Sequence, residues 1–122
     1  MIQKSRSSRF VGALLATATA SRAFAHAVVV ASTPAAGAVV APGADVPIEI
    51  RFNTRIDAAR SRLTLARPDG SSVVAPLEKS QSNLSLSATV RGLAEGDYLL
   101  RWQTLSLDGH IAHGEIPFRV GR

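Results

Sequence analysis

From residue 46 onward, hydrophobic and polar residues repeatedly alternate with a period of two. Side chains of an extended strand point to opposite faces in turn, so this pattern is typical of half-buried β-strands. The alternation predicts five clear strands and two weaker ones. The clear strands are Val46–Phe52, Leu63–Leu65, Leu84–Val90, Tyr98–Trp102 and Ile116–Val120, and the weaker ones are Ala27–Ser32 and Ser72–Pro76.

Segments rich in Pro, Gly and Asp separate these runs, among them "TPAAGAVVAPGAD", "RPDGS", "LAEGD" and "LDGH". The only helix we expect is one short turn within Ile56–Arg60. Seven short strands joined by turns predict an all-β fold, a seven-stranded antiparallel Greek-key β-sandwich of immunoglobulin-like or cupredoxin-like architecture. Tyr98 and Trp102 share the alternating face of Leu100, which favours core packing over a ligand-binding aromatic platform.

The first 25 residues have the features of a cleaved secretory signal peptide. A basic start precedes an apolar stretch of 11 residues, Phe10–Ala20, and Ala23–Ala25 has the small-x-small form of a cleavage site. The apolar stretch is too short to cross a bilayer, which takes about 20 residues. We therefore predict export to the periplasm, and a single mature domain over residues 26–122 that begins at His26.

The charge and sulfur content of this mature domain exclude several functions. Ten of the 14 Lys and Arg residues and all nine acidic residues follow residue 25, so the high overall charge belongs to the signal segment. No basic cluster with interleaved aromatics remains, which argues against nucleic acid as a partner. The chain has no Cys, and its one Met is Met1. The mature domain therefore offers no sulfur ligand to a metal and no thiolate nucleophile.

The candidate chemistry lies in three histidines and one aspartate. His110 and His113 follow Asp108 within the stretch "SLDGHIAHGE". Residues two apart in an extended segment point to the same side, so Asp108 and His110 can project together, whereas His110 and His113 would face opposite ways. An Asp-Gly pair is also a common hairpin turn, and that simpler interpretation stays open.

Cleavage after Ala25 would give His26 two nitrogen donors, its free α-amine and its ring Nδ1. An α-amine has an ordinary pKa of about 7.7–8.0, so a metal can displace its proton near neutral pH. With an Asp108 oxygen and a His110 nitrogen, the set becomes three nitrogens and one oxygen. Such donors suit Cu(II) in tetragonal geometry. Zinc could use the same donors but ranks lower in affinity.

Three segments resemble the CopC family of periplasmic copper-binding proteins. "HAVVVASTPAAGA" from His26 resembles the mature start of that family, and "PIEIRFN" from Pro47 resembles its early core strand. The most specific segment is "GDYLLRWQTLSLDGHIAHGEIPFRV". The residues at the expected spacings there are Gly96, Tyr98, Trp102, Ser106, Asp108, Gly109, His110, Gly114, Phe118 and Val120.

The resemblance implies a β-sandwich that holds one Cu(II) per chain in a histidine-brace site. His26 would supply its amine and imidazole, Asp108 its carboxylate and His110 its imidazole. A methionine-rich Cu(I) site, found in some relatives, would be absent here. The family has no fixed ligand at His113, which would be a surface residue, a residue that supports the ligands from behind, or an accessory ligand.

We therefore expect a monomeric exported Cu(II)-binding protein of copper resistance and homeostasis, and not an enzyme. It would buffer copper or deliver it to an inner-membrane copper transporter of the CopD type. Two alternatives stay open at this point. One is an oxidative enzyme with a histidine-brace copper, and the other is a metal-free structural or interaction sandwich.

Overall fold

The structure is a computed structural model that describes residues 27–80 and 82–122 of the chain. It contains eight strands and one 3-10 turn, η1, over Ala58–Arg60. No helix within these residues is long and apolar enough to cross a membrane. The strands are β1 (Val29–Thr33), β2 (Ala38–Val40), β3 (Val46–Phe52), β4 (Arg62–Ala66), β5 (Ser72–Val74), β6 (Ser85–Val90), β7 (Gly96–Leu105) and β8 (Ile111–Val120).

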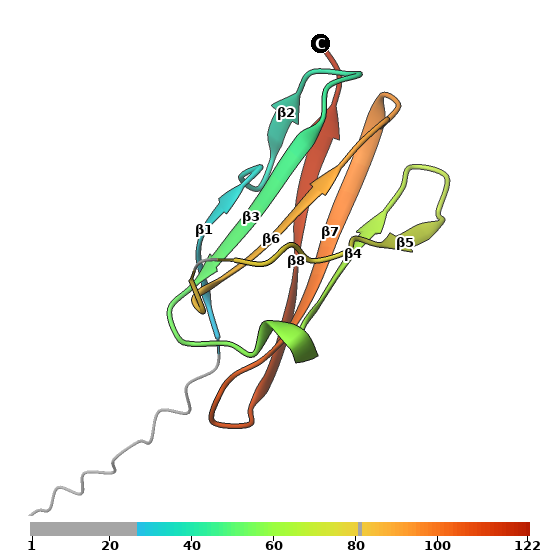
Figure 1. The fold of residues 1–122 in the computed structure, drawn as a ribbon. Coiled ribbons are helices and arrows are strands. Elements are labelled where there is room, and N and C mark those ends of the chain that lie inside the picture. The colour runs from blue at the N-terminus through green and yellow to red at the C-terminus, as the bar shows by residue number, and fades with distance from the viewer. Residues whose placement is uncertain (1–26, 81) are drawn as a thin grey trace, which may run out of the picture.

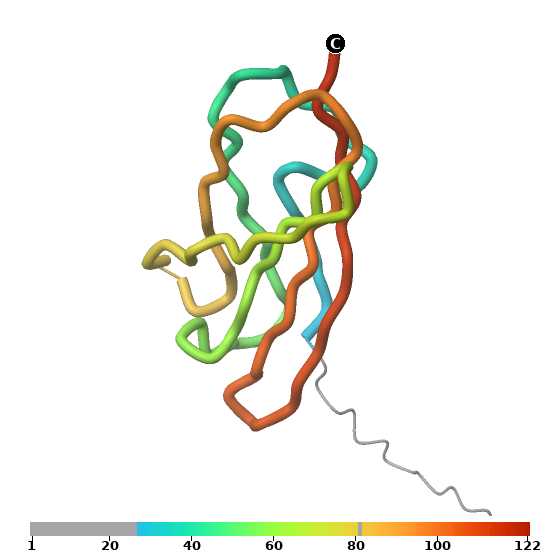
Figure 2. The backbone as a smooth tube through the Cα atoms, turned by 90° about the vertical axis from the view of Figure 1, so that its right-hand side faces the viewer, coloured from blue at the N-terminus to red at the C-terminus, as the bar shows by residue number. Residues whose placement is uncertain are grey.

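The strands form two sheets that pack face to face, as Figures 1 and 2 show from two sides. The smaller sheet has the order β1-β3-β6, and the larger has the order β2-β8-β7-β4-β5. β7 and β8 form the longest hairpin, with ten residue pairs in register from Gly96 opposite Val120 to Leu105 opposite Ile111. This hairpin carries the stretch from Asp108 to His110 at its turn.

The core lies between the two sheets, where the apolar side chains of one sheet pack against those of the other. β3 alternates buried and exposed residues along its whole length, with Ile50 fully buried. Phe52 packs edge-to-face on Trp102 across the sandwich, with ring centroids 5.0 Å apart. Tyr98 stacks on Phe118 at 5.4 Å, and its hydroxyl donates to the Ala94 carbonyl at 2.7 Å.

The predicted all-β sandwich is confirmed, and so is the core position of the two large aromatics. Tyr98 is 5% exposed and Trp102 is 7% exposed. The Trp102 ring crosses directly over Gly114, where an added Cβ would lie 2.5 Å from the ring atom Cζ2. Any larger residue at position 114 would collide with this ring, so a glycine is required there.

Two details of the fold prediction were wrong. There are eight strands rather than seven, because Ala38–Val40 is a strand inside a segment that we predicted to be a turn. β2 also pairs with β8 in parallel, so the sandwich is not purely antiparallel. Gly37 explains both differences: it adopts a φ of +82° and donates to the distant Pro117 carbonyl at 2.8 Å, which brings the short apolar run onto the edge of the large sheet.

Candidate metal centre

The β7–β8 turn is a closed loop held by its own backbone. The Ser106 N–H donates to the His110 carbonyl at 2.8 Å, and the Gly109 N–H donates to the Ser106 carbonyl at 2.8 Å. Gly109 has a φ of +93°, a left-handed conformation that favours glycine. The hairpin interpretation of the Asp-Gly pair is thus confirmed, and the turn itself brings the two candidate ligands together.

Asp108 and His110 form a pair at the tip of this turn. The His110 N–H donates to Asp108 Oδ1 at 3.1 Å, and His110 Nδ1 lies 3.0 Å from the same oxygen. The backbone N–H bond, and after it the imidazole, stabilise the carboxylate and hold the pKa of Asp108 below its ordinary value of 3.8. Asp108 is therefore a carboxylate at neutral pH.

The N-terminal end of the described chain is fixed by Asn53, at the end of β3. The Val28 N–H donates to Asn53 Oδ1 at 2.9 Å, and the Asn53 N–H donates to the Val28 carbonyl at 3.0 Å. Ala27, the first described residue, is buried at 5% exposure. The sequence interpretation gave Asn53 no role. Its one signal was a polar residue directly after a buried strand end.

The segment that follows Asn53 also holds the β7–β8 turn. The Leu107 N–H donates to the Arg55 carbonyl at 3.2 Å, and the Asp57 N–H donates to the Leu105 carbonyl at 2.8 Å. Figure 1 shows the entry to β1 and the β7–β8 turn at the same end of the sandwich. Asn53 and Asp108 line one surface depression, together with Thr54, Arg55, Leu84 and Leu107.

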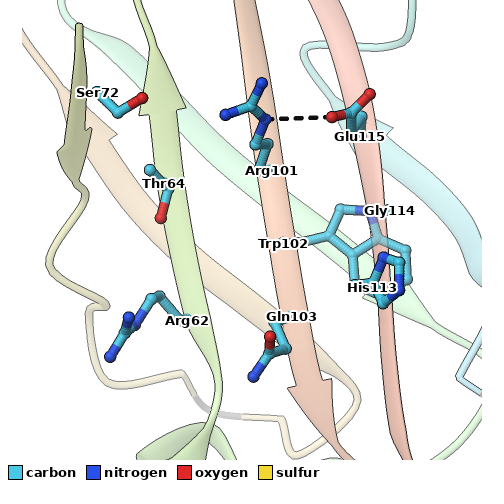
Figure 3. Close-up of a pocket in the computed structure, with 9 residues that line it drawn as sticks. All are labelled: Arg62, Thr64, Ser72, Arg101, Trp102, Gln103, His113, Gly114 and Glu115. Atoms are coloured by element: carbon cyan, nitrogen blue, oxygen red, sulfur yellow. Dashed lines mark hydrogen bonds and ion pairs between the residues drawn. The ribbon is translucent and has the colours of Figure 1, made fainter.

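His113 lies in different surroundings, on the outer face of the five-stranded sheet. It pairs with Gln103 in the β7–β8 register and lines a shallow depression that also includes Arg62. Figure 3 shows this depression, with Arg101 donating to Glu115 at 3.1 Å above His113. The one carboxylate that lines this depression, Glu115, is thus already paired with Arg101. The expectation that it lies at the surface agrees with this position.

Two buried hydroxyls lie on β7 and at the start of the turn. Thr104 is fully buried and Ser106 is 2% exposed. Neither hydroxyl has a hydrogen-bond partner within the described part of the chain. A buried hydroxyl without a partner opposes folding by about 1–3 kcal/mol. This end of the sandwich therefore holds more polar groups than its own packing satisfies.

The fit of these residues to a metal depends on the chemistry of the donors. Asp108 and His110 are one hard oxygen donor and one imidazole donor on a rigid turn, a combination that borderline divalent metals accept. The third predicted ligand, His26, lies outside the described residues. Within residues 27–80 and 82–122, no group of three or more His, Cys, Asp or Glu side chains could hold a metal.

These features define an immunoglobulin-like β-sandwich with a histidine–carboxylate pair on the turn of its longest hairpin. The chain belongs to the CopC family: the CopC domain model matches residues 29–121. The predicted family is thereby confirmed, and with it a family relationship to copper resistance and copper transport proteins.

Three proteins of known name are similar to the chain in sequence or fold. The crystal structure of CopC from Methylosinus trichosporium OB3b is 28% identical, with a TM-score of 0.71, and the match covers 78% of this chain and 93% of that one. PcoC, a methionine-rich copper resistance protein from Escherichia coli, shares the fold at 22% identity and a TM-score of 0.59, over 80% of this chain and all of PcoC. The copper transport protein CutJ of Bacillus subtilis is 26% identical over 81% of this chain. The match spans only 19% of CutJ.

Proposed function

We propose that this chain is an exported Cu(II)-binding protein that buffers copper or delivers it to a membrane copper transporter. The observation that carries the proposal is the link between the two halves of the candidate site. Asn53 bonds to Val28, two residues after His26, and the same segment bonds to the turn that carries Asp108 and His110.

In the proposed site, one Cu(II) is the cargo and His26, Asp108 and His110 are its ligands. Cleavage after Ala25 would free the α-amine of His26, which together with its imidazole supplies two nitrogens from one residue. His110 supplies a third nitrogen. The Asp108 carboxylate supplies an oxygen and a negative charge that favours Cu(II) over Cu(I). Because Met1 is the only sulfur-containing residue in the chain, a sulfur-based Cu(I) site is not part of the proposal.

Binding and delivery, rather than catalysis, account best for the remaining surface. An oxidative enzyme with this ligand set would need a substrate platform beside the metal. The two largest aromatics, Tyr98 and Trp102, are instead buried in the core. The likeness to part of CutJ, a copper transport protein, supports a transporter as the acceptor of the copper. We propose that this acceptor is an inner-membrane transporter of the CopD type. We propose that this chain itself is periplasmic and monomeric.

A competition titration with Cu(II) tests the proposed function. The mature chain that begins at His26 should bind one Cu(II). The same chain with the α-amine of His26 acetylated loses the amine donor and its chelate ring, and should bind at least about 100-fold more weakly. Equal affinity in the two proteins, or binding no tighter than to a short histidine peptide, would exclude the proposed site.

A further inference from the structure

Asn53 is the residue through which the N-terminal chain is joined to the rest of the sandwich. Its side-chain Oδ1 accepts from the Val28 N–H at 2.9 Å, and its backbone N–H donates to the Val28 carbonyl at 3.0 Å. These two bonds close a ring between residues that are 25 positions apart. Regular pairing between β1 and β3 begins one residue further on, with Val29 opposite Phe52.

The side-chain bond is therefore an addition to the sheet ladder, placed where the ladder ends. β1 carries an irregularity between Val29 and Ala31, so its first residues are weakly supported by regular pairing. Without Asn53 Oδ1, the Val28 N–H would have only solvent as a partner. The side chain thus fixes the backbone at Val28, the second described residue.

The same short segment fixes the turn that carries the other candidate ligands. Arg55 accepts from Leu107 through its backbone carbonyl, and Asp57 donates to the Leu105 carbonyl. Asn53 also lines the surface depression that Asp108 lines. One segment of five residues, 53–57, therefore sets the position of the N-terminal chain relative to Asp108.

We propose that Asn53 is a positioning residue for copper, which holds the chain so that the N-terminal ligand meets Asp108 and His110 without further ordering. This inference rests on the proposed function. Preorganisation of a ligand raises affinity because less conformational entropy is lost on binding. Asn53 is exposed and polar, so its removal leaves the hydrophobic core intact.

The test is a thermodynamic cycle on Cu(II) affinity, with Asn53→Ala as one change and acetylation of the His26 α-amine as the other. In the mature protein, Asn53→Ala should weaken Cu(II) binding about tenfold, equal to about 1.4 kcal/mol. In the acetylated protein, the amine chelate is already lost, and Asn53→Ala should change the affinity by less than about twofold. Circular dichroism confirms that all four proteins are folded.

Two further variants separate positioning from general stability. Thr89→Val removes an exposed side-chain hydrogen bond from the same sheet, the 3.2 Å bond to Glu78, and should leave Cu(II) affinity unchanged. Asn53→Asp keeps an acceptor for the Val28 N–H, so hydrogen exchange at that amide in the copper-free protein should be faster in Asn53→Ala and unchanged in Asn53→Asp.

The outcomes distinguish this inference from the proposed function. If the mature wild-type protein binds Cu(II) no better than its acetylated form, both are overturned. If acetylation weakens binding to the wild type and Asn53→Ala retains full affinity, the function stands and the positioning role of Asn53 is overturned. An equal loss in the mature and acetylated proteins would also overturn it, because Asn53 would then act on the fold in general.

Discussion

His110 and His113 lie three residues apart in the chain but in two unlike regions of the molecule. His110 is on the β7–β8 turn, 3.0 Å from a carboxylate, at the end of the sandwich where the N-terminal chain enters. His113 is on the outer face of the five-stranded sheet, opposite Gln103, in a depression lined by Arg62 and by the Arg101–Glu115 ion pair. The carboxylate of Glu115 is thus already neutralised by Arg101, whereas the Asp108 carboxylate beside His110 attracts a metal ion.

The difference shows that an imidazole becomes a candidate ligand through its surroundings. The turn supplies His110 with a carboxylate that orients the ring, and with a rigid backbone on both sides. The strand gives His113 a fixed direction, and the anion in its depression, Glu115, is paired with Arg101. The following predictions test whether these two regions differ in function as they do in structure.

The largest expected contrast is between the two histidines themselves. His110→Ala should weaken Cu(II) binding by about 100-fold or more. Loss of a residue that only supports a ligand lowers metal affinity by about 10–100-fold, so loss of a ligand should reach or exceed that range. His113→Ala should change the affinity by less than about twofold, as expected of a surface substitution. Competition titrations on the two mature variants measure both. Equal losses would remove the distinction between the two regions.

The next contrast concerns Gly114, which we expect to be important for stability and not for copper. Gly114→Ala would place a Cβ 2.5 Å from the Trp102 ring, which packs on Phe52 across the core. Overpacking of this kind opposes folding by about 1–3 kcal/mol. Urea unfolding should show that loss, while Cu(II) affinity of the folded variant stays within about threefold of wild type. A larger loss of affinity would make the strand next to His113 part of the site.

A smaller effect is expected from Asp108→Asn, which keeps the shape of the side chain and removes its charge. Cu(II) affinity should fall about tenfold, because the amide oxygen is a weaker ligand than a carboxylate. Isothermal titration calorimetry at neutral pH measures the change. An unchanged affinity would mean that Asp108 orients His110 without contributing charge to the metal.

The same variant has a pH dependence with a definite sign. The lowered pKa of Asp108 means that its carboxylate stabilises the fold above pH 3.8, and that this contribution is lost as the pH falls through the lower folded-state value. The stability difference between wild type and Asp108→Asn should therefore be constant near neutral pH and shrink below about pH 4. Urea unfolding at several pH values tests this, and a difference that grows on acidification would contradict it.

The smallest effect is expected at Thr104, beneath the His110 turn. Its hydroxyl is fully buried without a partner in the described part of the chain, so Thr104→Val should raise the free energy of unfolding of the copper-free protein by about 0.5–1.5 kcal/mol. Thermal unfolding measures the change. Ala88→Ser, which adds a hydroxyl to the buried core elsewhere, should destabilise and serves as the opposite control. A destabilised Thr104→Val would mean that the hydroxyl has a partner in solution.

The sequence predicted most of the fold because the core is built from alternating strands. The buried residues of β3, β7 and β8 follow the period-two pattern directly. β2 was not predictable in the same way. Three residues are too few to establish a period, and the strand exists because Gly37 turns the chain onto β8. Parallel pairing at a sheet edge depends on that long-range contact.

The candidate site was predicted only in part for a similar reason. Asp108 and His110 are neighbours in the chain, so their pairing followed from local spacing, although a turn and not a strand produces it. Asn53 was missed because its partner Val28 lies 25 residues away. The buried hydroxyls of Thr104 and Ser106 were missed because both are polar residues at positions where the alternation would put an apolar one. In the sequence, such a position looks the same as the end of a strand.

Native mass spectrometry of the protein recovered after export, with and without Cu(II), tests directly whether the processed N-terminus forms a copper site. We expect a chain that begins at His26 and binds one copper ion, and a copper-free form for His110→Ala under the same conditions. A mature chain that begins at any other residue, or one that begins at His26 and binds no copper, would contradict this expectation.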